Sequence, residues 1–315
     1  MSAKAVSVVI PAFRAAGTLK RTIDSCLADV APHDIVVVLD GADAALEQVA
    51  RSSVDGVRVV VLPAQSGAPT CRNVGLCLVA TRYVMFLDAD DHVEGGLLSA
   101  AVGAGERSRA DLMLGSFSFE MPDGARQMMD VMRRYDDASR EGIMRKWLSG
   151  DYTPPCAVVW RSDFVRSLGG WDQALAKNQD GDLIYRALMA DARIALCRGG
   201  QGLYAQSDNP ARITLTNTRR TLGSQLAVLD KIRARLDDLP FDPSYELGLA
   251  YYSVARLAFS GGFDDIGRAA ETTARTLGLE GQPGSAPHHV LASMFGLRGK
   301  QRLASFVRRA IGGHA

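Results

Sequence analysis

YVMFLDADD, residues 83–91, is an apolar run that ends in three carboxylates. Its first five residues are aromatic, β-branched or long apolar side chains, which predicts a buried strand. Asp88, Asp90 and Asp91 follow within four positions, and their charges repel one another unless something positive lies among them. Magnesium and similar hard cations bind one or two carboxylates together with substrate phosphates. A cation with a diphosphate is therefore one interpretation, and a turn whose aspartates cap a helix starting near Glu94 is the other.

The same alternation of strand and helix runs through the N-terminal third of the chain. Strands that are apolar on both faces and separated by helices predict a mostly parallel sheet flanked by helices, which is an α/β fold. Ligands bind such sheets beyond the carboxyl ends of the strands. The sequence predicts strands at residues 5–10, 35–39, 57–62 and 83–87, and helices at residues 17–28, 44–52 and 69–80.

Polar residues follow each of these predicted strands. They are found at residues 11–13, at Asp40, at residues 65–67 and at residues 88–91. Because the carboxyl ends of parallel strands meet at one edge of a sheet, we expect these residues to lie together. This position favours the cation and diphosphate over a simple turn.

The pattern beyond residue 97 is less regular and then becomes helical. From Thr218 onward the apolar spacing is that of helices, with Asp242 expected as a cap and Pro243 in the first turn of one of them. The elements expected before that point are a helix from Leu97, a strand over residues 111–120, a polar stretch over residues 120–140, a helix around Trp147, a strand running into a helix over residues 156–165, and a helix from about Asp180 followed by a short strand.

Composition sets broad limits on the function. The chain has 315 residues, 47% of them hydrophobic and 23% charged, which suits one large or two modest globular domains. Its 36 basic and 35 acidic residues nearly cancel, so no overall charge attracts it to nucleic acid. We therefore expect no nucleic-acid partner.

The cysteines and the hydropathy pattern suggest a cytoplasmic location. The five cysteines contain no C-x-x-C pair, and we interpret them as buried thiols in a reducing compartment. The first residues lead directly into an apolar strand, too short for a signal peptide, and no apolar run reaches the length of a membrane span. We expect a cytoplasmic protein, with a peripheral position at the inner face of the plasma membrane as the alternative.

Several familiar catalytic motifs are absent from the sequence. PAFRAAG stands after the first strand in place of G-x-G-x-x-G, which argues against a dinucleotide-dependent dehydrogenase. The sequence also lacks G-x-x-x-x-G-K-[ST], G-x-S-x-G and H-E-x-x-H. P-loop, nucleophile-elbow and zinc-peptidase chemistries are therefore excluded.

Four ordered blocks carry a resemblance to a known family. VSVVIPAFRAAGTLKRTIDSCL, IVVVLDGADAA, QSGAPTCRNVGLCLVATRYVMFLDADD and, further on, LGGWDQALAKNQDGDLIYRAL resemble the family 2 glycosyltransferases. That resemblance implies the GT-A fold and a nucleotide-diphospho-sugar donor. It implies a glycosyltransferase domain over residues 1–217, with a donor-binding half at 1–96 and an acceptor half at 97–217. A helical C-terminal region over residues 218–315 lies outside the resemblance.

The resemblance implies a set of donor-binding positions. Phe13 would pack on the base, with an anchor from loop to core as the alternative, and Asp40 would accept a hydrogen bond from the base. Leu39 stands where many members have a second aspartate. Arg72 would meet the diphosphate, with a solvated arginine as the alternative. The implied donor positions are Pro11, Phe13, Asp40, Arg72, Asn73 and Asp88.

The resemblance also implies a catalytic base. The family places this base in an E-D or Q-D pair before a helix, and Gln179 with Asp180 stands at that position. Asp180 is therefore expected to take the proton of the acceptor hydroxyl, although an N-cap aspartate would look the same in sequence. Asp182 is the second choice. The resemblance also associates Trp171 with a wall of the acceptor site, with core packing as the alternative. It associates Arg186 with substrate contact, with a salt bridge within the domain as the alternative.

The implied cofactor is Mn²⁺ or Mg²⁺. Asp90 is expected to bind it, with Asp91 as a further ligand or as a support for the first. Many relatives have a histidine after a later strand, where this sequence reads LYAQSDNPARIT. The substitutes considered there are Ser207, Asp208, Asn209 and Arg212.

The expected reaction is an inverting sugar transfer from a donor, with UDP-sugar favoured, to a glycan or lipid-linked acceptor in bacterial polysaccharide or glycoconjugate synthesis. A non-catalytic nucleotide-sugar-binding module and a sugar-1-phosphate nucleotidyltransferase are the alternatives. Residues 299–311 read as an amphipathic basic helix that contacts a membrane surface, or as a helix packed on the domain with a solvated basic face.

Overall fold

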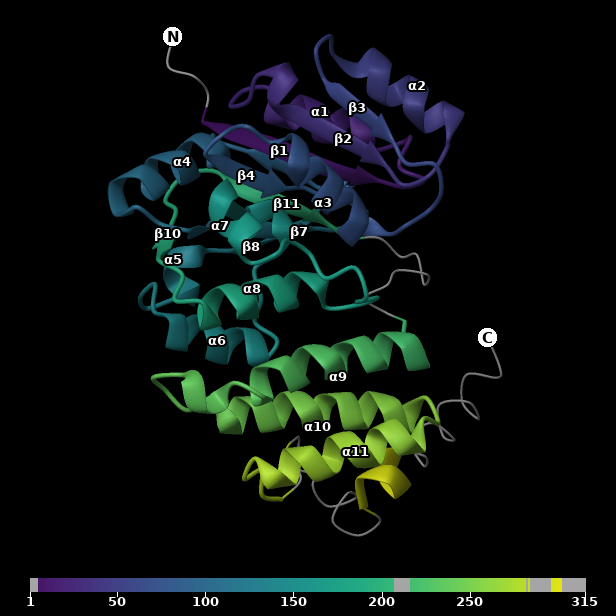
Figure 1. Ribbon diagram of the computed structural model, residues 1–315, viewed down its shortest axis with the longest axis vertical. Coiled ribbons are helices and arrows are strands. Elements are labelled where there is room, and N and C mark those ends of the chain that lie inside the picture. Colours follow the sequence, from purple (N-terminus) through teal and green to yellow (C-terminus); the bar gives the residue numbers. More distant parts are fainter. Residues whose placement is uncertain (1–4, 207–215, 282, 284–295, 302–315) are drawn as a thin grey trace. The chain divides into compact units, whose positions relative to one another are not determined.

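The computed structural model describes residues 5–206, 216–281, 283 and 296–301 (Figure 1). The chain divides into two compact units, each with contributions from several segments. The first unit comprises Met1–Ile143, Tyr152–Gln173 and Asp182–Asp208, and the second comprises Met144–Asp151, Ala174–Gly181 and Asn209–Ala315.

A seven-stranded sheet forms the centre of the first unit, in the order β10-β6-β9-β4-β1-β2-β3. Every neighbouring pair is parallel except the pairs that β9 makes with β4 and β6. The mostly parallel α/β fold is therefore confirmed. The strands are β1 (Val6–Ala12), β2 (Ile35–Leu39), β3 (Arg58–Val61), β4 (Tyr83–Phe86), β6 (Leu112–Leu114), β9 (Val158–Arg161) and β10 (Ile194–Leu196).

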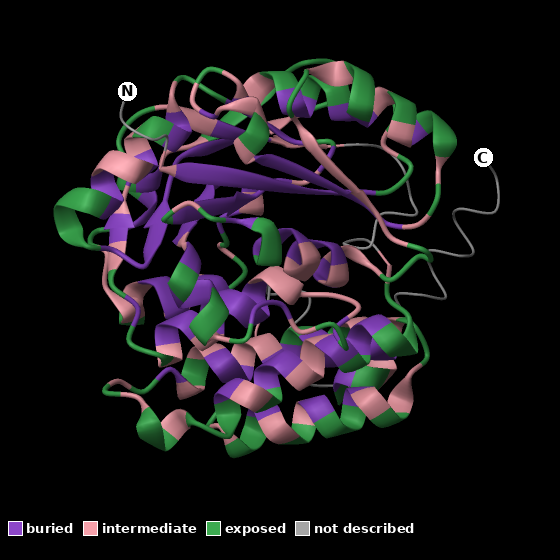
Figure 2. Ribbon diagram, turned by 45° about the horizontal axis from the view of Figure 1, so that its top comes forward, coloured by how far each residue is buried: buried purple, intermediate pink, exposed green. Residues whose placement is uncertain are grey.

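Helices cover both faces of this sheet, as the two-sided apolar strands predicted. Val8 and Ile10 of β1 pack in one core cluster with Leu19 and Leu46 from two of the helices. Val9, on the opposite face of the same strand, lies so close to the third helix that only a glycine of that helix fits against it. The inner strands are accordingly buried almost entirely, whereas the edge strands β3 and β10 are only partly buried (Figure 2). The helices are α1 (Leu19–Cys26), α2 (Ala44–Ser53), α3 (Ala68–Leu78) and α4 (Leu97–Ser108).

A second, four-stranded sheet was not predicted. Its order is β5-β11-β7-β8, with β5 (His92–Glu94), β11 (Gln201–Ala205), β7 (Phe117–Glu120) and β8 (Arg126–Met129). The single strand predicted over residues 111–120 is wrong, because β6 and β7 belong to different sheets. β8 lies in the stretch expected to be merely polar, and β5 occupies the place of a helix near Glu94. Strands of three or four residues give too little periodicity to be read from the sequence.

The remaining elements of the chain follow the predicted order. The strand running into a helix is β9 followed by α7, and the helix near Trp147 is also present. These helices are α5 (Val131–Arg134), α6 (Arg140–Leu148), α7 (Ser162–Ser167) and α8 (Gln179–Met189), with 3-10 turns at Pro32–Asp34, Pro155–Ala157 and Leu236–Asp238.

The second unit is helical, as expected. Its long helices are α9 (Arg219–Arg233), α10 (Ser244–Ser260) and α11 (Asp264–Thr276), and α10 packs against the other two. Asp242 does accept the N–H of Ser244 at 2.9 Å, but Pro243 is the residue before the first helical one and not part of the first turn. Arg145, at the end of α6, binds Glu246 of α10 at 2.6 Å.

The surface corrects one expectation about the cysteines. Cys77 is exposed near the end of α3, whereas the other four thiols are buried.

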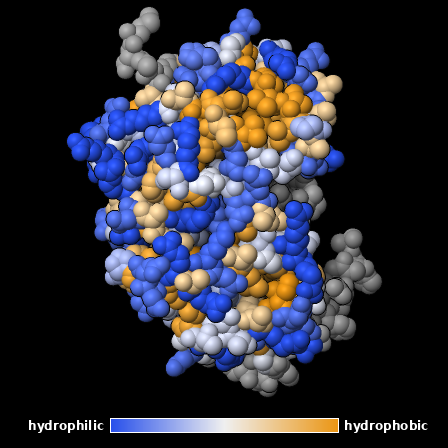
Figure 3. Space-filling model, in the orientation of Figure 1, coloured by the Kyte–Doolittle hydropathy of each residue, from blue (hydrophilic) through white to orange (hydrophobic). Residues whose placement is uncertain are grey.

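Hydrophobic residues also reach the surface of the first unit. All four residues of the edge strand β3 are only half-buried, and hydrophobic residues lie at the surface in the upper part of Figure 3. Among the described residues, no helix has both the length and the apolar character needed to cross a membrane.

Candidate active site

The carboxyl edge of the large sheet brings the predicted polar residues of the first unit together. β1 pairs with β2 through Ala12 and Leu39, and with β4 through Val9 and Phe86. Asp40 follows β2 directly, and its N–H bonds to the carbonyl of Ala12 at 2.9 Å. The residues after β1, β2 and β4 therefore emerge side by side at this edge.

Asp40 closes the loop that leads into α3. Its carboxylate is 6% exposed and accepts the N–H of Ser66 at 2.6 Å and that of Gly67 at 3.0 Å. Gly67 is the N-cap of α3 with φ +89°, a conformation that other residues rarely adopt. A carboxylate at a helix N-terminus is stabilised by the helix dipole. Asp40 thus fixes the loop, and a contact with a base would come in addition to these bonds.

The thiol of Cys71, one turn into α3, lies beside Asp40. Burial, and after it the charge of Asp40, raises the pKa of this thiol to about 12. The thiol is therefore protonated near neutral pH and is not an activated nucleophile.

Arg72 and Asp88 form an ion pair at the centre of the edge. Arg72 is 3% exposed, and its Nη2 donates to Oδ1 of Asp88 at 2.5 Å. Its guanidinium carbon lies 4.3 Å from the centre of the Trp171 ring. The Asp88 side chain is 32% exposed, so one side of the pair is open to solvent. The alternative of a solvated arginine is not what the structure shows.

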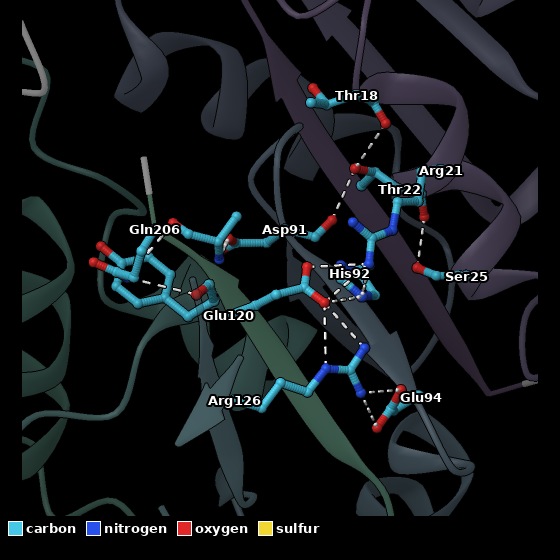
Figure 4. Close-up of polar contacts among 12 residues, drawn as sticks. Thr18, Arg21, Thr22, Ser25, Asp91, His92, Glu94, Glu120, Arg126 and Gln206 are labelled. Atoms are coloured by element: carbon cyan, nitrogen blue, oxygen red, sulfur yellow. Dashed lines mark hydrogen bonds and ion pairs between the residues drawn. The ribbon is translucent and has the colours of Figure 1, made fainter. Parts of the chain in front are cut away.

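The loop after β4 is anchored through Asp91 and presents Asp90. Asp91 is 1% exposed, and its Oδ1 accepts the N–H of Ala205 at 2.9 Å. Thr22 of α1 donates to the carbonyl of Asp91 at 2.8 Å (Figure 4). It also donates to the carbonyl of Ala89 at 3.0 Å. Asp90, between these anchored residues, is exposed. In this turn the Asp91 side chain is therefore buried, and the adjacent Asp90 side chain is exposed.

The donor set for a cation is small. Within the described residues, no group of three or more His, Cys, Asp or Glu side chains is arranged to hold a metal ion. The Asp90 side chain is exposed, and Asp91 supports the loop that carries it. This fits a magnesium-type ion, which takes one or two protein carboxylates and completes its shell with phosphate and water oxygens. It does not fit a closed all-protein metal site.

Phe13 and Pro11 flank the end of β1. Pro11 is buried within the strand, whereas Phe13 is 45% exposed just after it. The Arg14 guanidinium lies 5.0 Å from the centre of the Phe13 ring, and Arg14 has φ +51°. The ring is therefore presented at the surface and does not anchor the loop to the core.

Asn73 binds the backbone of Trp171, and Arg186 binds carbonyls of the turn just before Trp171. Arg186 also pairs with Asp182 at 2.7 Å. Asp182 is 1% exposed, which places it inside the fold as a structural partner of Arg186. The Asn73 amide is thus engaged by protein backbone.

Gln179 and Asp180 are the first two residues of α8 and belong to the second unit. Gln179 donates to the carbonyl of Leu175 at 3.0 Å. The cluster in the first unit does not include these two residues. Ser207, Asp208, Asn209 and Arg212 lie outside the described residues.

A charged cluster on the small sheet was not foreseen from the sequence (Figure 4). Arg21 and Arg126 both bind the Glu120 carboxylate at 3.0 Å, and Arg126 also binds Glu94 at 3.2 Å. Arg21 lies 2.8 Å from Nε2 of His92. Burial lowers the pKa of His92, and the charge of Arg21 lowers it further. These residues come from four different elements, so no short motif could have indicated them.

Comparisons with known proteins indicate the family to which the chain belongs. A family model described as glycosyl transferase family 2 matches residues 7–167, about half of the chain. A pre-mycofactocin glycosyltransferase of Mycobacterium tuberculosis is 28% identical over 193 residues, which is 60% of this chain and 40% of the relative. The poly(ribitol-phosphate) beta-N-acetylglucosaminyltransferase TarP of Staphylococcus aureus is 31% identical over 123 residues, covering 37% and 38% of the two chains.

A solved structure shows the same fold. The crystal structure of S. aureus TarS 1-349 in complex with UDP-GlcNAc superposes with a TM-score of 0.59 at 15% identity, covering 86% of this chain and 91% of that one. The fold is thus the GT-A fold of nucleotide-sugar-dependent transferases. With the match of the family model, the chain belongs to glycosyl transferase family 2. It spans about 40% of the length of the mycobacterial relative.

Proposed function

We propose that this protein is an inverting glycosyltransferase that moves a sugar from a nucleotide-diphospho-sugar, with UDP favoured, to an acceptor hydroxyl. One observation carries this proposal: a buried arginine paired with a part-open aspartate, beside an exposed aspartate, at the carboxyl edge of the sheet of a family 2 chain. The complex of TarS with UDP-GlcNAc supports a donor of this kind.

Arg72 supplies the charge that the donor diphosphate needs. A guanidinium binds phosphate oxygens through charge-assisted hydrogen bonds, which are about twice as strong as neutral ones. Phe13, exposed at the end of β1, offers an aromatic face to the base, and Asp40 holds the loop before α3 in place. Pro11 sets the start of the donor loop, and Asn73 supports the site through the backbone of Trp171.

Mn²⁺ or Mg²⁺ is the proposed cofactor. Asp90 would hold it with diphosphate and water oxygens, and Asp91 supports the loop or adds a ligand. When bound, such an ion neutralises charge that develops on the leaving nucleoside diphosphate.

Asp180 is the proposed base. The acceptor oxygen forms a bond to the anomeric carbon while the bond from that carbon to the diphosphate oxygen breaks on the opposite side, which inverts the anomeric centre. The proton of the acceptor hydroxyl passes to the Asp180 carboxylate, and the electron pair of the broken bond leaves with the diphosphate. No covalent intermediate with the protein is needed. Gln179 precedes this base at the start of α8.

The acceptor is proposed to be a glycan or a lipid-linked glycan in bacterial polysaccharide or glycoconjugate synthesis. Relatives whose names place them in such syntheses support this class, among them TarP. A peripheral contact with the inner face of the plasma membrane through residues 299–311 stays a prediction, since only residues 299–301 of that segment are described.

Release of nucleoside diphosphate tests the proposal. UDP-, GDP- and dTDP-sugars are offered with and without Mn²⁺ or Mg²⁺ to the wild type and to Asp90→Ala and Asp180→Asn. We expect metal-dependent release from one donor, weaker metal-dependent donor binding in Asp90→Ala, and retained donor binding without transfer in Asp180→Asn. Asp55→Ala removes an exposed aspartate after α2 and serves as the control, with wild-type behaviour expected.

Two results would count against this account. Normal turnover in Asp180→Asn would remove Asp180 from the role of base. Binding of a nucleotide sugar by the wild type without release, in the presence of candidate acceptors, would favour a binding module.

A further inference from the structure

A chain of contacts inside the first unit leads from α8 to the carboxyl edge of the sheet. Arg186 donates from Nη1 to the carbonyl of Leu168 at 2.7 Å and from Nη2 to that of Gly170 at 2.8 Å. Its charge is balanced by the buried Asp182, at 2.7 Å. A charged donor on two carbonyls of one turn fixes that turn. Trp171 follows this turn directly.

Asn73 of α3 holds Trp171 from the other side. Its Nδ2 donates to the carbonyl of Trp171 at 2.9 Å, and its Oδ1 accepts the N–H of Trp171 at 2.8 Å. The amide thus completes both backbone hydrogen bonds of one residue, as a neighbouring strand would. Gly170 has φ +70°, and a Cβ there would lie 2.5 Å from Oδ1 of Asn73. A side chain at position 170 would therefore displace the amide.

The indole of Trp171 is held as firmly as its backbone. Phe86, the last residue of β4, packs edge-on against it, with centroids 5.3 Å apart and planes at 80°. Trp171 is only 4% exposed, and the Arg72 guanidinium carbon lies 4.3 Å from its ring centroid. A desolvated contact between a guanidinium and an indole face is stronger than an exposed one. Arg72 is therefore restrained while its Nη2 meets Asp88.

We propose that Trp171 is a positioning residue for donor binding. It acts through Arg72, whose guanidinium it orients toward Asp88, and it does not have to touch the donor. A long arginine side chain loses rotamer freedom when it binds a ligand, and holding it in place beforehand lowers that cost. This role differs from a wall of the acceptor site. It rests on the proposed function, because Arg72 and Asp88 matter here as contacts of the donor diphosphate.

The dissociation constant of UDP in the presence of Mn²⁺ tests the role. We expect Trp171→Leu to weaken UDP binding about tenfold. Trp171→Phe keeps an aromatic face and should recover most of that loss, to within about threefold of the wild type. In an Arg72→Met background, Trp171→Leu should have no further effect, which a merely structural role would not produce. If Trp171→Leu does not fold, Trp171→Met, which also lacks the aromatic face, replaces it with the same expected loss.

Trp160 provides a matched control. It lies on β9, is also 4% exposed, and its strand carries none of the residues that hold Trp171. Trp160→Leu should lower the melting temperature without weakening UDP binding. Wild-type UDP affinity in Trp171→Leu would overturn this inference and leave the proposed function intact. The same holds if Trp171→Leu loses UDP affinity tenfold both with Arg72 present and in the Arg72→Met background. Failure of the wild type to bind UDP, GDP or dTDP would overturn the proposed function, and the inference with it.

Discussion

Two charged regions of the first unit are built in opposite ways. At the carboxyl edge of the large sheet, one buried arginine, Arg72, meets one carboxylate, Asp88, which is 32% exposed. On the small sheet, Arg21 and Arg126 meet one carboxylate, Glu120, which is 12% exposed. Arg72 stacks on the Trp171 ring, and the Asp88 carboxylate is partly exposed to solvent. On the small sheet, the charged groups bind one another.

The difference indicates what each region does. In the cluster around Glu120 the charges are balanced by protein groups from α1, β5, β7 and β8, so the cluster joins those elements. At the carboxyl edge, Arg72 is held in place before any ligand arrives, and the open Asp90 lies two residues from its partner. Charges balanced within the protein contribute stability, and the exposed carboxylates at the carboxyl edge are available to a cation.

The largest expected effect follows from removing the buried arginine. Arg72→Met should weaken UDP binding in Mn²⁺ about 100-fold, because charge-assisted hydrogen bonds to the diphosphate are lost. The melting temperature should change little, since Asp88 is partly solvated and the apolar Met chain still covers Trp171. Titration calorimetry and thermal unfolding measure the two quantities.

Arg134 is the matched control for this variant. It is 8% exposed and also lies over aromatic rings, but it donates to the Thr153 hydroxyl and the Tyr152 carbonyl. Arg134→Met should lower the melting temperature and leave UDP affinity unchanged. Equal losses of affinity in both variants would remove the distinction between the two arginines.

A medium effect is expected on the small sheet, in stability and not in binding. Glu120→Gln should lower the free energy of unfolding by about 1 kcal/mol, because charge-assisted bonds to two largely exposed arginines are weakened. UDP affinity should remain that of the wild type. Urea unfolding with parallel UDP titration measures both, and a tenfold loss of affinity would show that the cluster belongs to the site.

The contribution of Glu120 to stability should also depend on pH. Burial on its own raises the pKa of Glu120, but the hydrogen bonds from Arg21 and Arg126 outweigh it and lower that pKa below the ordinary 4.5. Between the lowered pKa and 4.5 the unfolded state binds more protons, so stability rises with pH there. The wild-type advantage over Glu120→Gln should be full above pH 4.5 and shrink as the pH falls below it. A constant difference in urea midpoint across this range would contradict the pKa shift.

The smallest effect is expected for an ion pair of the second unit. Arg219 binds both oxygens of Asp265, at 2.6 and 3.0 Å, and the hydrogen bond lowers the pKa of Asp265 to about 2. Both side chains are more than half exposed, so water and salt screen the pair. Asp265→Asn should unfold at the same urea concentration as the wild type. A loss of stability as large as that of Glu120→Gln would show that the exposure of an ion pair does not indicate how much it stabilises the fold.

Much of the large sheet was predictable, because its signals are local. β1 to β4 and the helices between them show clear periodicity, and parallel order brings the residues that follow each strand to one edge. The division of residues 111–120 between two sheets was not predictable, since β6 and β7 are short and their partners are distant in sequence. The sequence alone also could not separate the buried Asp91 from the exposed Asp90.

Long-range contacts set the rest of the candidate site. Asn73 and Trp171 are 98 positions apart, and nothing near either residue indicates that one amide completes the backbone bonds of the other. Arg186, which pairs with the buried Asp182, binds the carbonyl of Leu168 from 18 positions further along the chain. Family resemblance identified these positions, but the structure was needed to show what their side chains contact.

The central claim is that the carboxyl edge around Arg72 and Asp90 binds a nucleoside diphosphate together with a divalent cation. A crystal structure of the protein with UDP and Mn²⁺ tests it most directly, because anomalous scattering locates the manganese ion. We predict the diphosphate within hydrogen-bond distance of Arg72 and the manganese ion on Asp90. Nucleotide bound elsewhere on the chain, with Asp90 free of manganese, would contradict the account.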